Sequence, residues 1–211
     1  MSKLLFAATI MLLVAGVASA GIIDPCNSPV VYTGPGIACY FSCPQGDNDS
    51  FSQQGFSFAF TVNDLVGQPI ENIPASDFWL IDCDPTLDLT LCAGSASSTA
   101  DSATNSNGQT TMSNGTLNAG GCADGLSPVV QGFVLEDPGA GCTPYCYTIL
   151  VRSPDLDGSL EVNLVDLALF SSCFPPQPYD KCCDFDCNAT INLQDLARFA
   201  FHFGPPGHKC N

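Results

Sequence analysis

Basic residues are scarce in this chain of 211 residues, which holds five Lys and Arg against 21 Asp and Glu and carries a formal net charge of −16. Nucleic acids and anionic membrane surfaces attract positively charged proteins, so we expect neither as a partner. Histidine is scarce as well: the sequence has two histidines, His202 and His208, and both lie close to the C-terminus. A catalytic triad in the first two hundred residues would therefore lack its base.

Other catalytic patterns are also missing. A glycosidase needs two carboxylates flanking a cleft, and the three glutamates of the chain include only Glu71 and Glu136 before residue 155. The sequence contains no glycine-rich phosphate loop, and the single Trp79 alternates with its neighbours as in a strand. Aspartates at 82, 84 and 88 are typical of surface turns, with a further cation site as the alternative. We predict that the protein is not an enzyme.

Long apolar runs are absent after the first twenty residues. Lys3 precedes an apolar stretch over residues 4–17, and Ala18-Ser19-Ala20 follows it as a cleavage pattern between small residues. This stretch is too short to span a membrane and is typical of a secretory signal peptide. We predict a signal peptide over 1–20, a mature chain beginning at Gly21, no membrane insertion, and a secreted, extracellular or cell-surface location.

Thirteen cysteines, all after residue 20, favour disulfides formed in an oxidising compartment. Eight of them precede the C-terminal region and can form four bridges among themselves. Five follow, so one is left over, either free or joined to another chain. Zinc bound by Cys182, Cys183 and Cys187, with His202 and His208 as further ligands, is the alternative, although no CxxC pair is present. The spacing alone does not give the pairing.

The most informative feature is a duplication. Residues 155–174 (DLDGSLEVNLVDLALFSSCF) and 184–203 (DFDCNATINLQDLARFAFHF) share nine of twenty positions without a gap. The shared residues are acidic at positions 1, 3 and 12 of each copy, and apolar at helical spacing just after. This pattern predicts a cation-binding loop followed by a helix, present twice.

The spacing fits calcium. Ca²⁺ takes six to eight oxygen ligands, which a twelve-residue loop supplies from positions 1, 3, 5, 7, 9 and 12. Solvated acidic turns at helix N-termini are the alternative, but two matching loops favour two calcium sites. The predicted ligands of the first loop (155–166) are Asp155, Asp157, Ser159, the carbonyl of Glu161, Asn163 and Asp166; those of the second loop (184–195) are Asp184, Asp186, Asn188, the carbonyl of Thr190, Asn192 and Asp195.

Each loop leads into an amphipathic segment of about ten residues, which Pro175-Pro176 ends in the first copy and residues 204–207 (GPPG) end in the second. Two loop–helix units in tandem over residues 154–204 resemble the dockerin module, in which each half keeps only the second helix of an EF-hand. This resemblance implies docking onto a cohesin-like protein. The chain departs from the family at position 6, where Leu160 and Ala189 replace the usual glycine. At positions 10 and 11, 164–165 (LV) and 193–194 (LQ) replace small hydroxyl residues, and these apolar residues fit a core equally well.

Residues 21–153 read as an all-β domain, because short apolar runs alternate with Gly-, Asn- and Pro-rich turns. About 130 residues with strands at this spacing favour a two-sheet sandwich, with residues 94–108 as an exposed loop. Thr61–Ile70 and Thr104–Thr111 resemble segments of bacterial immunoglobulin-like domains of the invasin type, which implies a spacer or adhesive role. The expected strands are 30–33, 38–41, 55–62, 78–82, 87–92, 110–117, 129–135 and 145–151.

The predicted fold is therefore mostly β with a small α module: an immunoglobulin-like β-sandwich over 21–153, followed by a dockerin-like calcium-binding domain over 154–211. We expect a secreted, non-catalytic, calcium-binding protein whose partner is a cohesin-like or other extracellular protein. One alternative is a structural subunit that binds copies of itself in an extracellular filament or matrix. A third option is an accessory protein of carbohydrate-active enzymes that bears a dockerin.

Overall fold

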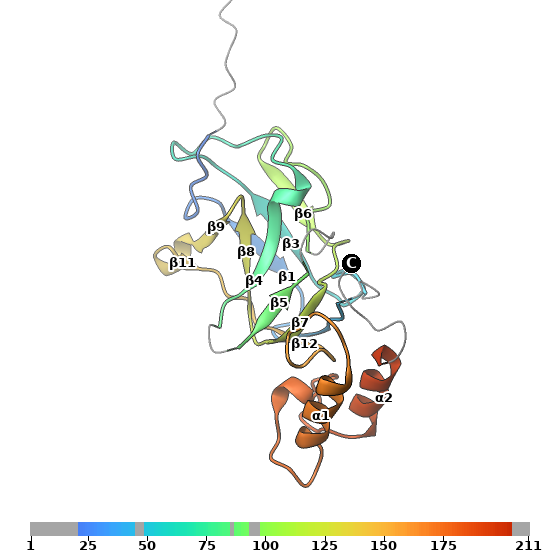
Figure 1. Ribbon diagram of the computed structural model, residues 1–211. Helices are drawn as coiled ribbons and strands as arrows, with labels where there is room; N and C mark the ends of the chain where they lie inside the picture. The colour runs from blue at the N-terminus through green and yellow to red at the C-terminus, as the bar shows by residue number, and fades with distance from the viewer. Residues whose placement is uncertain (1–20, 45–48, 85–86, 93–97, 204–211) are drawn as a thin grey trace, which may run out of the picture.

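The computed structural model describes residues 21–44, 49–84, 87–92 and 98–203; the predicted signal peptide lies outside them. These residues form a mostly β protein with a small helical part at one end (Figure 1). The two helices are α1 (Leu164–Cys173) and α2 (Leu193–His202). The strands are β1 (Val30–Thr33), β2 (Ala38–Phe41), β3 (Ser57–Thr61), β4 (Phe78–Asp82), β5 (Leu89–Leu91), β6 (Gln109–Met112), β7 (Ala119–Ala123), β8 (Leu126–Val130), β9 (Phe133–Val134), β10 (Glu136–Asp137), β11 (Thr143–Pro144) and β12 (Ile149–Arg152).

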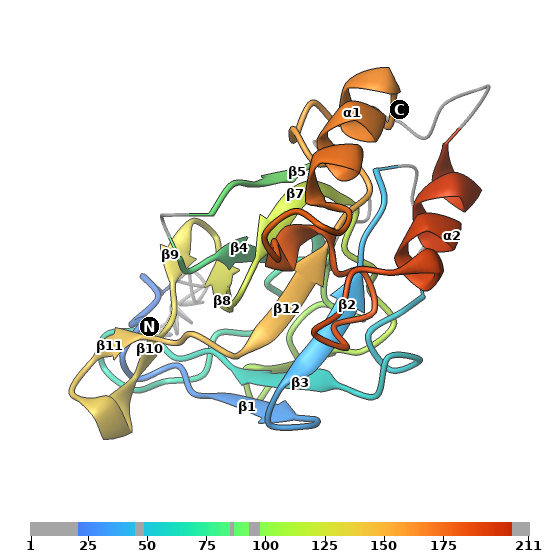
Figure 2. The same cartoon turned by 90° about the horizontal axis from the view of Figure 1, so that it is seen from below.

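The strands make four hydrogen-bonded sheets, with the orders β1-β3-β6, β2-β12-β7-β5, β4-β8-β9 and β10-β11. The strand pairs are antiparallel, except that β2 and β12 run parallel with Ala38 opposite Ile149. Since β2 and β12 are far apart in sequence, this pairing brings the end of the β part next to its beginning. β12 leads directly into the first loop, so the four-stranded sheet carries the helical part (Figure 2).

Alternating burial defines the main core, which lies between the sheets of the β part. In β3, Phe58 and Phe60 are buried whereas Ala59 between them is exposed. Phe78 and Leu80 of β4 are buried in the same way and join the same core. This is the period of two that a strand with one covered face requires. The predicted strands at 30–33, 38–41 and 78–82 are confirmed with identical limits.

Other strand predictions need correction. The run 129–135 does not form one strand, because Gln131 and Gly132 adopt positive φ values of 50° and 87° and turn the chain from β8 into β9. β7 was not predicted, since its sequence AGGCA has no strand-forming apolar residue. The described part of the expected exposed loop, residues 98–108, includes buried Ser98 and Thr104, whose hydroxyls bond the backbone of neighbouring segments.

A second, smaller core holds the helical part together. Phe170 of α1 stacks on Phe199 of α2 and on Phe185 of the second loop, with ring centroids 5.3 and 5.4 Å apart. Val162 and Ile191, at position 8 of the two loops, are buried in the same core. The two helices have the predicted length of about ten residues. Their repeated Phe positions, Phe170 and Phe199, pack against each other.

Five disulfides join described residues: Cys26–Cys142, Cys39–Cys187, Cys83–Cys146, Cys122–Cys182 and Cys173–Cys183. The sequence left the pairing open, and in the structure two of these bridges, Cys39–Cys187 and Cys122–Cys182, connect the β part to the helical part. Sulfur ligation of zinc by cysteines 182, 183 and 187 is excluded here, since all three are in disulfides. The bridges indicate an oxidising environment. None of the helices in the described ranges combines the length and apolar character of a membrane-crossing helix.

Candidate metal centre

The two predicted loops have the same backbone shape. At position 6, where a twelve-residue calcium loop usually has a glycine for its sharp turn, Leu160 and Ala189 have positive φ values of 66° and 63°, in the left-handed region. Position 4 is left-handed in both loops as well, with Gly158 in the first and Cys187 in the second. A left-handed conformation costs a non-glycine residue about 1–2 kcal/mol. Both loops accept this cost at position 6, so other interactions outweigh it there.

In the first loop the aspartate at position 1 supplies those interactions. Its Oδ1 accepts a hydrogen bond from the amide of Ser159 at 3.1 Å, and its Oδ2 accepts one from Leu160 at 2.7 Å. The amide of Ser159 also donates to Asp157 Oδ1 at 3.0 Å, so it bridges two carboxylates. The second loop repeats this pattern at the same distances to position 1: Asn188 and Ala189 donate to Asp184 at 3.1 and 2.7 Å, and Asn188 also donates to Asp186 at 3.2 Å.

The aspartate at position 12 closes the first loop and starts the helix. Asp166 accepts hydrogen bonds from the amides of Leu156 and Asn163, at 2.7 and 2.8 Å. Asn163 in turn accepts from the amide of Val165 at 2.8 Å, which completes a capping box at the start of α1. In the second loop Asp195 accepts from Phe185 and Asn192 at 2.8 and 2.9 Å, and Asn192 accepts from Gln194 at 2.7 Å.

The side-chain oxygens of the three aspartates in each loop gather in one place. Donor atoms of Asp155, Asp157 and Asp166 lie within 4.8 Å of one another, and so do those of 184, 186 and 195. In each loop the aspartates at positions 1 and 12 are buried, with exposed fractions of 0–1%. Two ionised carboxylates at this separation repel by about 3 kcal/mol at an effective dielectric constant of about 20. A bound cation would offset this repulsion in each cluster.

Burial, with a contribution from neighbouring carboxylates, raises the pKa of three of the loop aspartates. Burial raises the pKa of Asp155 to about 7, and a shared hydrogen bond with Asp157 adds to this rise. Burial also raises the pKa of Asp166. In the second loop, burial followed by the charges of the neighbouring aspartates raises the pKa of Asp186. Burial acts to raise the pKa of Asp157 too, but its hydrogen bonds from Ser159 outweigh this and lower it.

The remaining predicted ligands lie around the same clusters. The carbonyl oxygen of Glu161 accepts from the Ser159 hydroxyl at 3.3 Å and from the Asn163 amide group at 3.1 Å. The carbonyl of Thr190 accepts from Asn192 at 3.2 Å in the second loop. The side-chain oxygens of the two asparagines at position 9 are engaged at the helix caps. Position 9 commonly reaches calcium through a water molecule, so this engagement fits the loop type.

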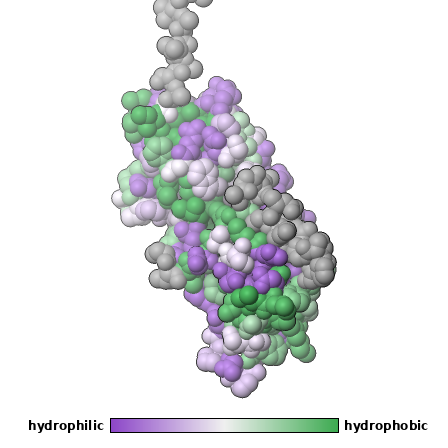
Figure 3. Space-filling view, viewed as in Figure 1, coloured by the Kyte–Doolittle hydropathy of each residue, from purple (hydrophilic) through white to green (hydrophobic). Residues whose placement is uncertain are grey.

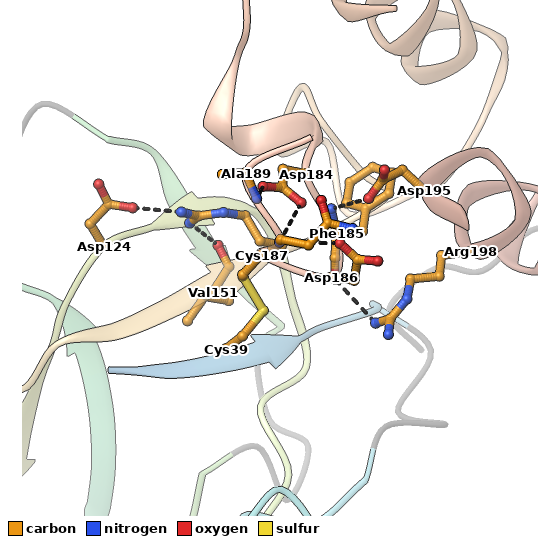
Figure 4. Close-up of a disulfide and its surroundings, with 12 residues drawn as sticks. Cys39, Asp124, Val151, Asp184, Phe185, Asp186, Cys187, Ala189, Asp195 and Arg198 are labelled. Carbon is orange, nitrogen blue, oxygen red and sulfur yellow. Dashed lines mark hydrogen bonds and ion pairs between the residues drawn. A yellow bond between two sulfur atoms is a disulfide. The ribbon is translucent and has the colours of Figure 1, made fainter. Parts of the chain in front are cut away.

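Sequence reasoning missed contacts that come from outside the loops. The hydroxyl of Tyr179 donates to Asp184 Oδ2 at 2.7 Å, and burial together with this bond raises the pKa of Tyr179 to about 12. Figure 4 shows that the disulfide partner of Cys187 is Cys39, on strand β2, beside the aspartates of the second loop. In the sequence, the one feature that set Cys187 apart is that it takes the place of Gly158 at position 4 of the repeat.

Two further groups of acidic residues and cysteines occur among the described residues. They are Cys26, Glu136 and Cys142, and Cys173, Asp180 and Cys183. In both groups the two cysteines form a disulfide with each other. A thiolate is the form of cysteine that binds metal, so these groups lack the required donor.

No protein-family model matches this chain, and neither a curated protein nor a solved structure is significantly similar to it.

Proposed function

We propose that this chain is a secreted, non-catalytic protein that binds two calcium ions in a dockerin-like C-terminal module and uses that module for calcium-dependent docking. The observation that carries the proposal is the repetition of one arrangement. In both loops three carboxylates converge, and the same backbone amides hold the aspartates at positions 1 and 12. Solvated acidic turns are not expected to share buried carboxylates that accept hydrogen bonds from the same backbone positions.

The donor atoms favour calcium over other cations. Every predicted donor is an oxygen, which suits a hard cation and disfavours zinc or copper. Mg²⁺ requires a small octahedral site and keeps most of its waters, whereas Ca²⁺ accepts the six to eight oxygens of a twelve-residue loop. Asp157 is exposed and Asp186 is half-buried, so each ion would retain access to water on one side.

Docking is supported by apolar residues at the surface of the module. Leu164 and Leu193, at position 10 of the two loops, are each 72% exposed, and Val165 is 52% exposed. They contribute little to a core, so the alternative interpretation of these positions is not favoured. In Figure 3 apolar surface gathers over the end of the molecule where the helices lie. Paired apolar residues of this kind suit the face of an extracellular, cohesin-like protein.

The same geometry explains why docking would depend on calcium. Leu164 and Leu193 are the first residues of their helices. The residue before each leucine caps the helix, and the position-12 aspartate two residues after it is a proposed ligand. Binding energy at the loops would therefore order the two helix starts that present the leucines.

Calorimetric titration of the full chain with calcium chloride tests this proposal. We expect two ions per chain, and we expect Asp166→Asn together with Asp195→Asn to weaken both sites by at least about tenfold, because each change removes a charged ligand. Glu71→Gln is the matched control, since Glu71 is an exposed acidic residue outside the loops. A wild-type chain that takes up no calcium at millimolar concentration would refute the proposal.

Self-association is the second candidate function. Ile22, Leu65 and Val66 form another exposed apolar group, 64%, 63% and 78% exposed, on the β part. The amide of Leu65 donates to the carbonyl of Ile22, so the group is contiguous. Copies joined through this group and the module would form chains of subunits. Light scattering that finds a monomer both in calcium and in chelator would contradict this candidate.

A further inference from the structure

We propose that the β part supplies part of the support of each calcium loop, so that calcium affinity depends on residues outside the repeat: Cys39 for the second loop, and the Gly120-Gly121 pair of β7 for the first. This inference rests on the calcium binding proposed above. It adds positioning residues that the repeat itself does not contain.

In the second loop the support is covalent. Cys187, at position 4, has a φ of 55°, where the first loop has a glycine. Its sulfur is bonded to Cys39 in β2 (Figure 4). The next residue, Asn188, uses its amide to bridge Asp184 and Asp186. The disulfide therefore fixes the peptide that aims this amide at two carboxylates.

Strand β2 makes a second contact with the same region. Phe41 lies two residues after Cys39, so both side chains leave β2 on the same face. The Phe41 ring lies 5.8 Å from that of Phe185, which follows the first aspartate of the second loop. The guanidinium of Arg198 lies 5.7 Å from the Phe41 ring and donates to the carbonyl of Phe185 at 3.1 Å. These contacts hold the loop against the strand that bears Cys39.

In the first loop the support comes from the backbone of β7. The amide of Gly121 donates to the carbonyl of Asp155 at 2.6 Å. A side chain at Gly120 would collide with the carboxylate of Asp155. The hydroxyl of Ser153 donates to the carbonyl of Ala119 and accepts from the amide of Asp155, at 3.0 and 3.2 Å. The missing side chain of Gly120 and the amide of Gly121 therefore let β7 lie directly against the aspartate at position 1.

The supports are different in kind and can be removed one at a time. Two amides report on the loops separately: Leu160 and Ala189, which donate to the position-1 carboxylates of the first and second loop. Nuclear magnetic resonance of the full chain, titrated with calcium, follows both amides in one experiment.

Removing the disulfide with Cys39→Ser and Cys187→Ser should weaken calcium binding at Ala189 by about 10–100-fold, the usual effect of losing support behind a metal ligand. Binding at Leu160 should stay within about twofold, since its loop lies on β7. The matched control is Cys26→Ser with Cys142→Ser, which removes a disulfide that touches neither loop; both affinities should stay as in the wild type.

Gly120→Ala should give the opposite result: calcium binding to the first loop, followed at Leu160, should weaken, and calcium binding to the second loop, followed at Ala189, should stay unchanged. Gly36→Ala is its control, because a methyl group there meets nothing within 4 Å. The amide of Leu80, in the main core, reports that the β part of each variant is folded.

Three outcomes overturn specific claims. If neither amide of the wild type responds to calcium, the proposed function fails. If both respond, but the Cys39/Cys187 variant binds calcium at Ala189 as tightly as the wild type, the support by β2 is refuted while calcium binding stands. If Gly120→Ala with a folded β part leaves binding at Leu160 unchanged, the support by β7 is refuted in the same way.

Discussion

Replacing Phe170 by alanine tests how the two helices are held. Phe170 is 2% exposed, and its ring lies between those of Phe199 and Phe185, with interplanar angles of 10° and 15°. A third ring, that of Phe174, lies 6.0 Å away. This side chain is therefore the central contact of the small core between α1, α2 and the second loop.

The expected loss of stability follows from burial. Truncation of a buried phenylalanine costs about 3–5 kcal/mol through lost transfer energy and the cavity left behind. Phe170 also loses two stacked partners, each of which contributes about 0.5–1.5 kcal/mol beyond area burial. We expect about 4 kcal/mol for Phe170→Ala. Leu169, its neighbour in α1, is 39% exposed, so Leu169→Ala should cost only about 0.5 kcal/mol.

Hydrogen exchange of the α2 amides at fixed calcium concentration measures the difference. Disulfides keep the module attached to the β part, so the loss appears as local opening rather than global unfolding. Each 1.4 kcal/mol is about a tenfold change in an equilibrium constant, so Phe170→Ala should speed exchange in α2 by about a thousandfold and Leu169→Ala by about twofold. Equal exchange rates in the two variants would refute the idea that stacked rings hold the helices together.

Two other perturbations have definite outcomes. Burial acts to raise the pKa of Asp124, but the bonds from Lys181 and Arg152 outweigh burial and lower the pKa. The ion pair therefore stabilises the fold above about pH 4, which is the pKa of an aspartate in the unfolded chain. This stabilisation is lost as the pH falls through the lowered pKa of the folded state. Asp124→Asn leaves Arg152, 3% exposed, without its charged partner and should lower the free energy of unfolding by about 3 kcal/mol at pH 7. In acid titrations followed by circular dichroism, the difference in stability between variant and wild type should shrink below pH 4. A difference that does not change with pH would contradict the stabilising role of this ion pair. Leu164→Ser with Leu193→Ser should leave both calcium affinities unchanged and reduce fluorescence of a bound apolar dye, because these leucines are exposed; unchanged dye binding would show that they are not part of an accessible apolar surface.

The sequence predicted the local features of the module well. Duplication fixed the limits of the loops, because identical aspartates at positions 1, 3 and 12 allowed only one alignment. Each helix begins directly after Asn163 or Asn192, where a capping residue precedes an apolar period. Leu160 and Ala189 stand where the resembled family has glycine, and both adopt the left-handed backbone that glycine favours. In these cases the information lies within about twelve neighbouring residues.

Contacts between distant segments could not be predicted in the same way. Cys39 and Cys187 are 148 residues apart, and nothing in their spacing distinguishes this pair from other pairings. Strand β7 was missed because its glycines have low strand propensity; they allow close approach of the backbone to Asp155 at Gly120 and to Asp88 at Gly121. Tyr179 lies outside the repeat, so its bond to Asp184 had no sequence signal. The immunoglobulin-like assignment of the β part stays a prediction.

The most direct test of the paired calcium loops is an anomalous-difference map from crystals of the full chain grown in millimolar calcium. We expect two strong peaks, one within about 2.3–2.6 Å of oxygens from Asp155, Asp157 and Asp166, and the other at the same distances from Asp184, Asp186 and Asp195. Ordered aspartates without a peak in either loop would contradict the account.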